Sequence, residues 1–437
     1  MYNDRQNTRA TRYELSQAWE DKYGVKYSQD KTKLLQASKT LKDYCVRDGT
    51  KIICDEAFYH CNNLVSIQIP DSVTSIGEKG FEGCTALTEI HIPHGITSIE
   101  YRTFYHCDNL ISVHIPNSVK VIGMWAFRNC QSLTNIHIPE SVIKIEDDAF
   151  AHCKALVSVI IPNSVISIGR RAFNICTNLT SIDIPNSVKS IGCWAFRICQ
   201  SLVSIHFPDG ITRIENNTFE GCSSLTFVSI PDSVISIGEE AFYDCKSLTS
   251  IHLPNGIKSI ERSTFYNCES LKSITIPDGV TNIGDNAFYG CQSLSSIRIP
   301  ESITNIGCYA FYYCCSLSSI HIPEKVTNIG KSTFASCSSL TIIHIPDNVT
   351  NIGEGAFDHC SSLTSVRIPD NVTNIEERVF LRCENLAFIS IPNSVTSIKA
   401  NAFYYCKSLA TIQIPTGTRE KFEKMLDEEL WDKLIEK

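Results

Sequence analysis

The histidines of this chain could supply chemistry because they recur at a fixed spacing. Seven of the 12 histidines lie at multiples of 23 residues from one another. These seven are His91, His114, His137, His206, His252, His321 and His344. Imidazole binds metals and changes charge near neutral pH, so the column raises the hypothesis of a metal-binding or pH-sensing strip. The alternative is a solvent-facing row copied by duplication. We favour the alternative, because a single file is poor tetrahedral geometry and no carboxylate or thiolate lies regularly between its members.

Apolar and basic residues interrupt the same pattern and could contact a partner. Phe227, Ile342 and Phe388 stand where most repeats carry serine, and Arg298 and Arg367 share the histidine column. Large apolar side chains and arginines on a surface are typical of interaction hot spots. The alternative is that each apolar residue only covers its neighbour. These five residues and the seven histidines are the candidate partner-binding residues.

Motifs of catalytic and cofactor sites are absent from the sequence. There is no P-loop, no glycine-rich dinucleotide motif after a strand, and no HExxH or GxSxG pattern. The net charge of −8 is modest and does not suggest the basic stripe that nucleic acids require. We therefore expect no enzyme, no cofactor, no metal site and no nucleic-acid partner.

A 23-residue repeat must position the candidate side chains. The stretch Leu64–Pro70 returns along the chain, and all 16 prolines fall on its last position. A fixed period of this length indicates a solenoid. The pattern Leu-x-x-Ile-x-Ile-Pro predicts a short parallel strand that proline ends. Val-Thr-x-Ile predicts a second short extended segment, and Ala-Phe-x-x-Cys-x-x-Leu predicts one or two tight helical turns with one buried stripe.

Different segments flank the sixteen repeats, which occupy residues 48–415. Residues 1–47 predict an N-terminal cap, with a helix in residues 1–24 followed by a β-hairpin. Residues 416–437 predict a single amphipathic capping helix. Such terminal segments are expected, because the end coils of a solenoid would otherwise expose their core.

Cysteines form a column of their own. Of the 21 cysteines, sixteen recur from Cys61 to Cys406. The odd total, the lack of a CxxC pair and the lack of an apolar leader after Met1 favour reduced, structural thiols. These features favour a cytoplasmic protein, with the cell surface or secretion as the alternative. No apolar run approaches the ~18–20 residues that span a bilayer, so no membrane span is expected.

Aromatic residues also interrupt the segment around the repeated phenylalanine. Trp125, Trp194 and Tyr309 replace polar residues shortly before it, and tyrosine follows it in several repeats. We interpret both sets as packing between coils rather than as a recognition surface.

The repeat resembles a known family. The unit Ile-Pro-Asn-Ser-Val-x-Ser-Ile-Gly-x-x-Ala-Phe-x-x-Cys-x-x-Leu-Thr-Ser-Ile, as in residues 184–205, is similar to the BspA-type leucine-rich repeat, and the resemblance covers residues 48–415. It implies a curved right-handed solenoid with a concave parallel sheet and terminal caps. It also implies kinship with surface adhesins that bind host matrix proteins, although this chain shows no sorting domain after the repeats.

Together, the residues and the resemblance predict a leucine-rich-repeat-like β-solenoid that acts without catalysis. Its expected function is to bind a protein or a glycan on the exposed side of its sheet. The rival hypothesis is a structural spacer or a surface adhesin. We expect a monomer.

Overall fold

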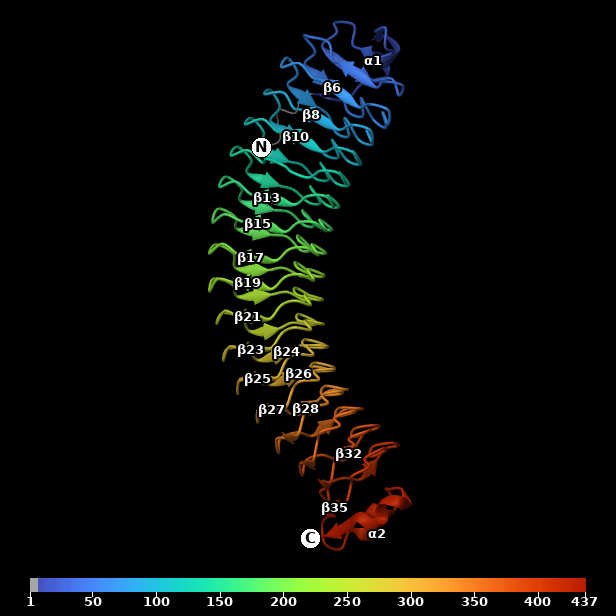
Figure 1. Ribbon diagram of the computed structural model, residues 1–437, viewed down its shortest axis with the longest axis vertical. Coiled ribbons are helices and arrows are strands. Elements are labelled where there is room, and N and C mark those ends of the chain that lie inside the picture. The colour runs from blue at the N-terminus through green and yellow to red at the C-terminus, as the bar shows by residue number, and fades with distance from the viewer. Residues whose placement is uncertain (1–6) are drawn as a thin grey trace. The chain divides into compact units, whose positions relative to one another are not determined.

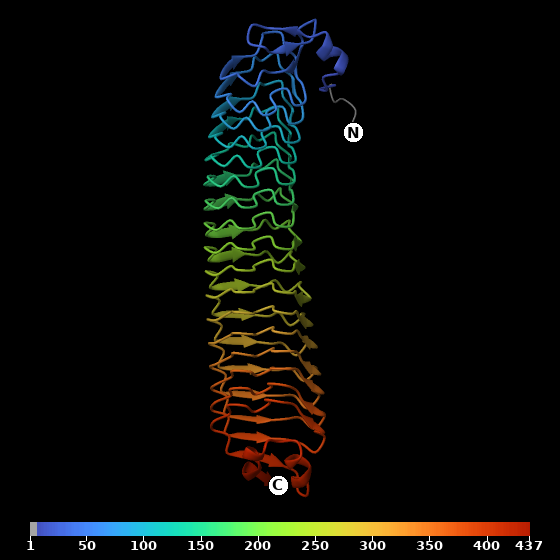
Figure 2. The same cartoon turned by 90° about the vertical axis from the view of Figure 1, so that its right-hand side faces the viewer.

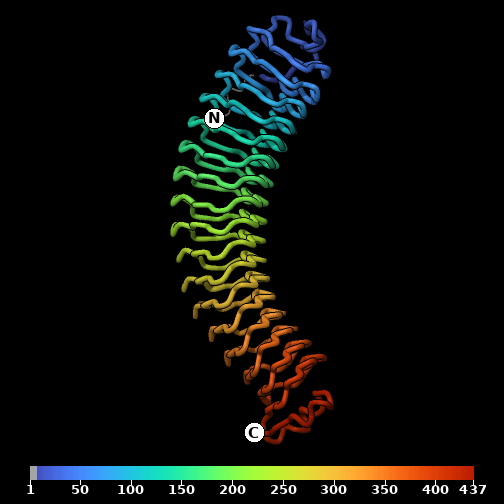
Figure 3. Tube along the Cα trace, viewed as in Figure 1, coloured from blue at the N-terminus to red at the C-terminus, as the bar shows by residue number. Residues whose placement is uncertain are grey.

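The computed structural model describes residues 7–437, which form a parallel β-solenoid with little helix (Figure 1). This confirms the fold class that the repeat predicts. The chain divides into two compact units. The first half comprises Met1–Ile211 and Asn217–Ser223, and the second half comprises Thr212–Asn216 and Ser224–Lys437. Within each half, successive coils lie next to one another along the chain, as Figures 2 and 3 show.

Most coils contain two short strands. The longer strands of the first half are β4 (Asp43–Cys45), β6 (Ser66–Gln68), β8 (Glu89–His91), β10 (Ser112–His114), β13 (Ser158–Ile160), β15 (Ser181–Asp183) and β17 (Ser204–His206). Those of the second half are β19 (Phe227–Ser229), β21 (Ser250–His252), β23 (Ser273–Thr275), β25 (Ser296–Arg298), β27 (Ser319–His321), β29 (Ile342–His344), β31 (Ser365–Arg367), β33 (Phe388–Ser390) and β35 (Thr411–Ile414).

The second strand of each coil has two residues. In the first half these strands are β5 (Ile52–Ile53), β7 (Ser75–Ile76), β9 (Ser98–Ile99), β11 (Val121–Ile122), β12 (Lys144–Ile145), β14 (Ser167–Ile168) and β16 (Ser190–Ile191). In the second half they are β18 (Arg213–Ile214), β20 (Ser236–Ile237), β22 (Ser259–Ile260), β24 (Asn282–Ile283), β26 (Asn305–Ile306), β28 (Asn328–Ile329), β30 (Asn351–Ile352), β32 (Asn374–Ile375) and β34 (Ser397–Ile398).

The strand register follows the sequence period. In β23 and β25, Ser273 lies opposite Ser296, and Ile274 lies opposite Ile297. In the three-residue strands the middle residue is buried, and in most of them its two neighbours face solvent. This is the alternation expected of a strand with one buried face. Equivalent side chains of successive coils therefore form columns.

The segment around the repeated phenylalanine contains turns, so the prediction of helical turns is wrong. The backbone N–H of Phe288 donates to the carbonyl of Ala310, one coil later, at 2.8 Å. The Cys291 N–H donates back to the Phe288 carbonyl at 3.2 Å. Two residues in this segment of each coil have positive φ, such as Ser263 and Asn267 in one coil. Hydrogen bonding between coils replaces the i→i−4 bonds of a helix.

Two isoleucines occupy strained positions in these turns. Ile175 and Ile198 have φ of 61° and 55°, a region that a β-branched residue rarely adopts. Replacing each by asparagine should therefore stabilise the protein by about 1 kcal/mol, because asparagine tolerates this backbone. Thermal unfolding of Ile175→Asn and Ile198→Asn, compared with the matched Ile→Val variants, measures the effect. Asparagine variants no more stable than the valine variants would contradict it.

Phenylalanines and cysteines build the core. In the second half, the Phe288 ring stacks between Phe265 and Phe311, with centroids 5.5 Å and 5.3 Å away. The Cys314 thiol donates to the Phe288 carbonyl at 3.2 Å, and this bond recurs along both halves. Where this bond forms, the thiol satisfies a buried turn carbonyl, which explains why a small hydrogen-bond donor recurs at this position.

The thiols should react in two classes. Burial raises the pKa of Cys176 and of Cys222 to about 12, and thiolate is the reactive form. Among the 21 cysteines, only Cys45, Cys193, Cys308 and Cys315 are exposed or partly exposed. We expect iodoacetamide to label these four in the native protein and the other 17 only after denaturation. Mass spectrometry of the labelled peptides measures this.

Cys45 supplies the internal rate reference for that experiment. Column cysteines labelled as fast as Cys45 in the native protein would contradict the expected burial.

The N-terminal cap contains less helix than its sequence predicts. Residues 1–6 of the predicted helix lie outside the described residues. The helix α1 spans only Arg12–Ser16, and β1 (Trp19–Glu20) follows it. Thr11 and Glu14 form a capping box at its start. The antiparallel hairpin is present as β2 (Lys26–Tyr27) and β3 (Lys33–Gln36).

The cap continues the stacking of the coils. Strand β3 pairs in parallel with β5, and β4 pairs in parallel with β6. Stacking therefore begins before the sequence repeat starts at residue 48.

The pattern of residues 416–437 predicts a single helix, but the structure forms three short elements there instead. It contains α2 (Arg419–Glu423), a 3₁₀ helix (Glu428–Lys433) and β36 (Leu434–Glu436). Strand β36 pairs in parallel with β35 and extends the sheet. The apolar residues Phe422, Leu426 and Leu430 are buried, so the segment still covers core. Pairing with β35 outweighs helical periodicity in its last residues.

Candidate functional site

The exposed side of the longer strands, here called the sheet face, carries nearly all candidate residues. Eleven of the twelve candidates lie on these strands. All eleven are exposed except Phe388, which is half-buried. His137 is exposed but lies outside any strand, because its coil has only the isolated bridge between Asn135 and Ser158.

Two histidines of the first half face each other across adjacent coils. His91 and His114 lie opposite each other in β8 and β10, with ring centroids 5.5 Å apart. Glu89 lies 3.1 Å from His91 Nε2. Within residues 7–437, no three histidine, cysteine or acidic side chains are grouped so as to hold a metal ion. The pair therefore lacks the ligand number of a typical zinc site.

Carboxylates do recur beside the basic column in the second half, contrary to the sequence interpretation. Each partner lies 20 residues earlier, on the turn that follows a proline. The pairs are Asp278 with Arg298 at 2.9 Å, Glu301 with His321 at 2.8 Å, Glu324 with His344 at 3.9 Å and Asp347 with Arg367 at 2.6 Å. In the sequence, these pairs are indicated by an acidic residue directly after the proline of each of these repeats. Recognising the pairs requires comparison between coils, because the strand and the turn come from different repeats.

The two arginine–carboxylate pairs are exposed on both sides, so they contribute little to stability. On β25, β27, β29 and β31, each arginine or histidine of the basic column therefore lies beside a carboxylate. A binding partner could exchange these pairs for its own at low cost.

The apolar candidates interrupt this charged surface. Ile342 is 61 % exposed and lies opposite Ser319 and Ser365 of the adjacent strands. Phe227 is 47 % exposed at the start of β19. Sequence reasoning missed Ile160 of β13, which is 72 % exposed in the first half. Its signal was an isoleucine in the column of histidines and arginines.

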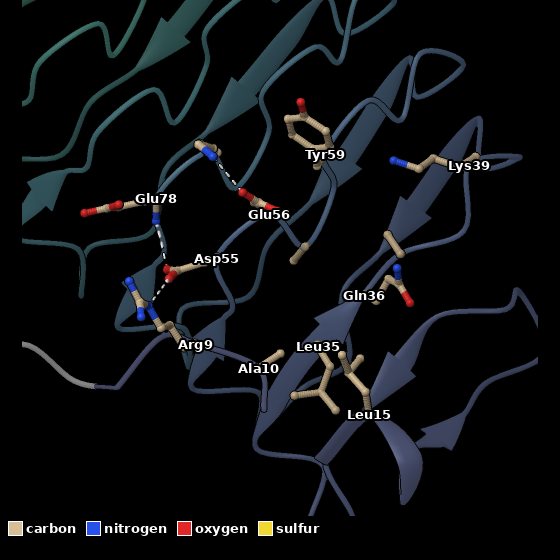
Figure 4. A pocket seen from close by; sticks show the side chains of 13 residues that line it. Arg9, Ala10, Leu15, Leu35, Gln36, Lys39, Asp55, Glu56, Tyr59 and Glu78 are labelled. Atoms are coloured by element: carbon tan, nitrogen blue, oxygen red, sulfur yellow. Dashed lines mark hydrogen bonds and ion pairs between the residues drawn. The ribbon is translucent and has the colours of Figure 1, made fainter. Parts of the chain in front are cut away.

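A cavity of about 490 Å³ lies beside the N-terminal segment (Figure 4). Arg9 Nε lies 3.9 Å from Asp55, and Glu56 accepts a hydrogen bond from Lys79 at 2.7 Å. Asp55 also accepts the N–H of Glu78 at 3.0 Å. These charged groups contact one another across successive coils. We therefore interpret them as structural contacts rather than as a ligand site.

The described residues include no helix of the length and apolarity needed to cross a membrane.

Comparison with known proteins links the chain to one repeat family. The family model described as "BspA type Leucine rich repeat region" matches residues 51–179, 166–291, 212–340 and 304–426. No curated protein sequence matches the chain.

Solved structures of two bacterial proteins match the chain. A leucine-rich repeat protein from Bacteroides ovatus is 28 % identical, with a TM-score of 0.62, over 96 % of this chain and 97 % of that one. A leucine-rich cell surface protein from Faecalibacterium prausnitzii is 27 % identical, with a TM-score of 0.42, over 93 % and 96 % of the two chains.

Proposed function

The chain belongs to the BspA-type leucine-rich repeat family, and from this premise we propose that it is a non-catalytic scaffold that binds a protein partner on its sheet face. Repeat proteins of this architecture offer long continuous surfaces, because each coil contacts only its neighbours. The absence of catalytic motifs from the sequence fits this function.

The observation that carries the proposal is the exposed Ile342 among polar side chains that contact carboxylates. Ile342 is 61 % exposed, and His321, His344 and Arg367 lie on the same or adjacent strands. An apolar centre with a polar rim is the usual organisation of a protein interface. An exposed isoleucine also favours a protein partner over a glycan, because it contributes binding free energy by burying apolar area.

Serine substitution tests the proposal with little risk to the fold, because serine is the common residue of this column. The triple variant Ile342→Ser, Phe388→Ser and Phe227→Ser should lose a partner that the wild-type protein captures by crosslinking and affinity purification. We expect at least a tenfold loss of captured partner, because hot-spot truncations typically cost about 2 kcal/mol or more.

Ile235→Ser supplies the matched control, because Ile235 is 56 % exposed but lies outside the longer strands. Equal loss in the control, or full capture by the triple variant, would contradict binding through the sheet face. A spacer would instead tolerate all these substitutions and respond to deletion of whole 23-residue repeats.

The location of the protein is part of the same proposal. The 21 free cysteines suit a reducing compartment such as the cytoplasm. The cell surface is the alternative, and one structural relative is named a cell surface protein. Cell fractionation separates the two and narrows the list of partners.

A further inference from the structure

Two tryptophans of the first half lie on the turns between the two-residue strands and the repeated phenylalanines, a surface here called the turn face. Trp125 and Trp194 have φ of 61° and 59°, the left-handed backbone that recurs at this repeat position in the other coils, for example at Asp148 and Arg378. A bulky residue in this backbone region is uncommon.

Arginines cover the rings of both tryptophans. The Arg102 guanidinium lies 4.1 Å from the Trp125 ring centroid, and Arg128 lies 5.4 Å from it. Tyr101 and Tyr105 lie beside the same ring, each with its centroid 5.9 Å away. The packing between coils that the sequence predicts is therefore present, but it includes cations.

The charges around Trp125 are largely paired within the chain. Arg128 contacts Asp148, and Arg102 lies 3.8 Å from the buried Glu82. Burial raises the pKa of Glu82, so its negative charge is disfavoured there.

Trp194 carries two arginines that lack such partners. Arg170 and Arg171 lie 4.6 Å and 5.0 Å from its ring centroid. In the described part of the chain, neither guanidinium has a carboxylate within ion-pair distance. The nearby Asp147 accepts the backbone N–H of Arg170 at 2.8 Å. A guanidinium stacked on an aromatic ring keeps its N–H edge free for a carboxylate.

We propose that Arg170, Arg171 and Trp194 form a second interaction surface, which binds an acidic peptide segment that also carries apolar side chains. The two guanidinium edges would each receive a carboxylate of the segment. The apolar side chains would contact the partly exposed ring of Trp194. This surface is independent of the sheet face, since it lies on other residues and in the first half alone.

An acidic peptide fits the surface better than a uniform polyanion. The Asp147 carboxylate lies close to Arg170 and would repel a row of sulfates or phosphates. A peptide can place few carboxylates and alternate them with apolar groups. Tryptophan and arginine are also the residues most enriched at protein hot spots.

The test uses a fluorescein-labelled 12-residue peptide that alternates glutamate and leucine, titrated into the full-length protein at low and high salt. Fluorescence anisotropy should show saturable binding that weakens with salt. Arg170→Gln with Arg171→Gln should weaken binding by about tenfold or more, because two charge-assisted contacts are lost. Arg170→Lys with Arg171→Lys should give an intermediate affinity, since lysine keeps the charge but not the stacked fork.

Arg378→Gln with Arg382→Gln is the control, because it removes two arginines from one coil of the second half, Arg378 before and Arg382 after the repeated Phe380. Arg378 occupies the same repeat position as Arg171. The control should bind like the wild type, and a peptide with glutamine in place of glutamate should not bind. Equal binding by the Arg170–Arg171 variant, or tighter binding of a heparin oligosaccharide or a single-stranded oligonucleotide, would overturn the proposal.

Discussion

Phe288→Asp should unfold the coils around it far below the melting temperature of the wild-type protein. The Phe288 side chain is fully buried and stacks on Phe265 and Phe311. The variant loses the buried ring and gains a charge without a partner, which together cost roughly 5 kcal/mol or more. Because each coil depends on its neighbours, the damage should divide the second half into separately melting segments.

Calorimetry and hydrogen exchange resolved by peptide measure this result. We expect a second, lower transition and loss of protection that is greatest in the coils next to residue 288. Phe288→Leu is the control, because it keeps an apolar side chain and should shift the transition only slightly. A single transition at the wild-type temperature for the aspartate variant would contradict a core that depends on the phenylalanine stack.

Gly307→Ala should also destabilise the second half, by about 1–3 kcal/mol. A Cβ at residue 307 would lie 2.5 Å from the backbone nitrogen of Asp285 and 2.6 Å from the carbonyl carbon of Gly284. These atoms belong to the backbone of the preceding coil and cannot turn away. The Gly307 N–H also donates to Ile283 at 2.8 Å, a bond that would lengthen if the coils separated.

Glu261→Ala gives a matched control at the same repeat position, since Glu261 already has a Cβ. It should change the melting temperature much less than Gly307→Ala. Similar effects of the two substitutions would show that close backbone approach does not explain the glycine. Thermal unfolding followed by circular dichroism measures both variants under the same conditions.

The repeat predicted the fold because its columns carry both strand alternation and burial. Ile274 and Ile297 could be placed opposite one another from the period alone, and the structure confirms this. The turns could not be predicted in the same way. The spacing of apolar residues around Phe288 fits a helix, but the Phe288 N–H donates to the Ala310 carbonyl of the next coil. Spacing within one repeat cannot predict a hydrogen bond between repeats.

The candidate site was predictable only in part, for a similar reason. Exposure of Ile342 follows from alternation in its strand. The pairing of Glu301 with His321 joins a turn to a strand across coils, so local reading missed it. The guanidinium of Arg170 lies over Trp194, whose backbone is left-handed, and the residue type at position 194 does not predict that conformation.

The hydrogen bonds of the column thiols point toward the N-terminus, the part of the chain that is synthesised first. The Cys314 thiol donates to Phe288 of the preceding coil, whereas the Phe288 N–H donates to Ala310 of the following coil. A ribosome releases the earlier coil first, so each thiol finds its acceptor already in place when its own coil emerges. Only the newest coil then waits for a backbone acceptor. Folding can therefore follow translation coil by coil, with the unfinished surface confined to the growing end.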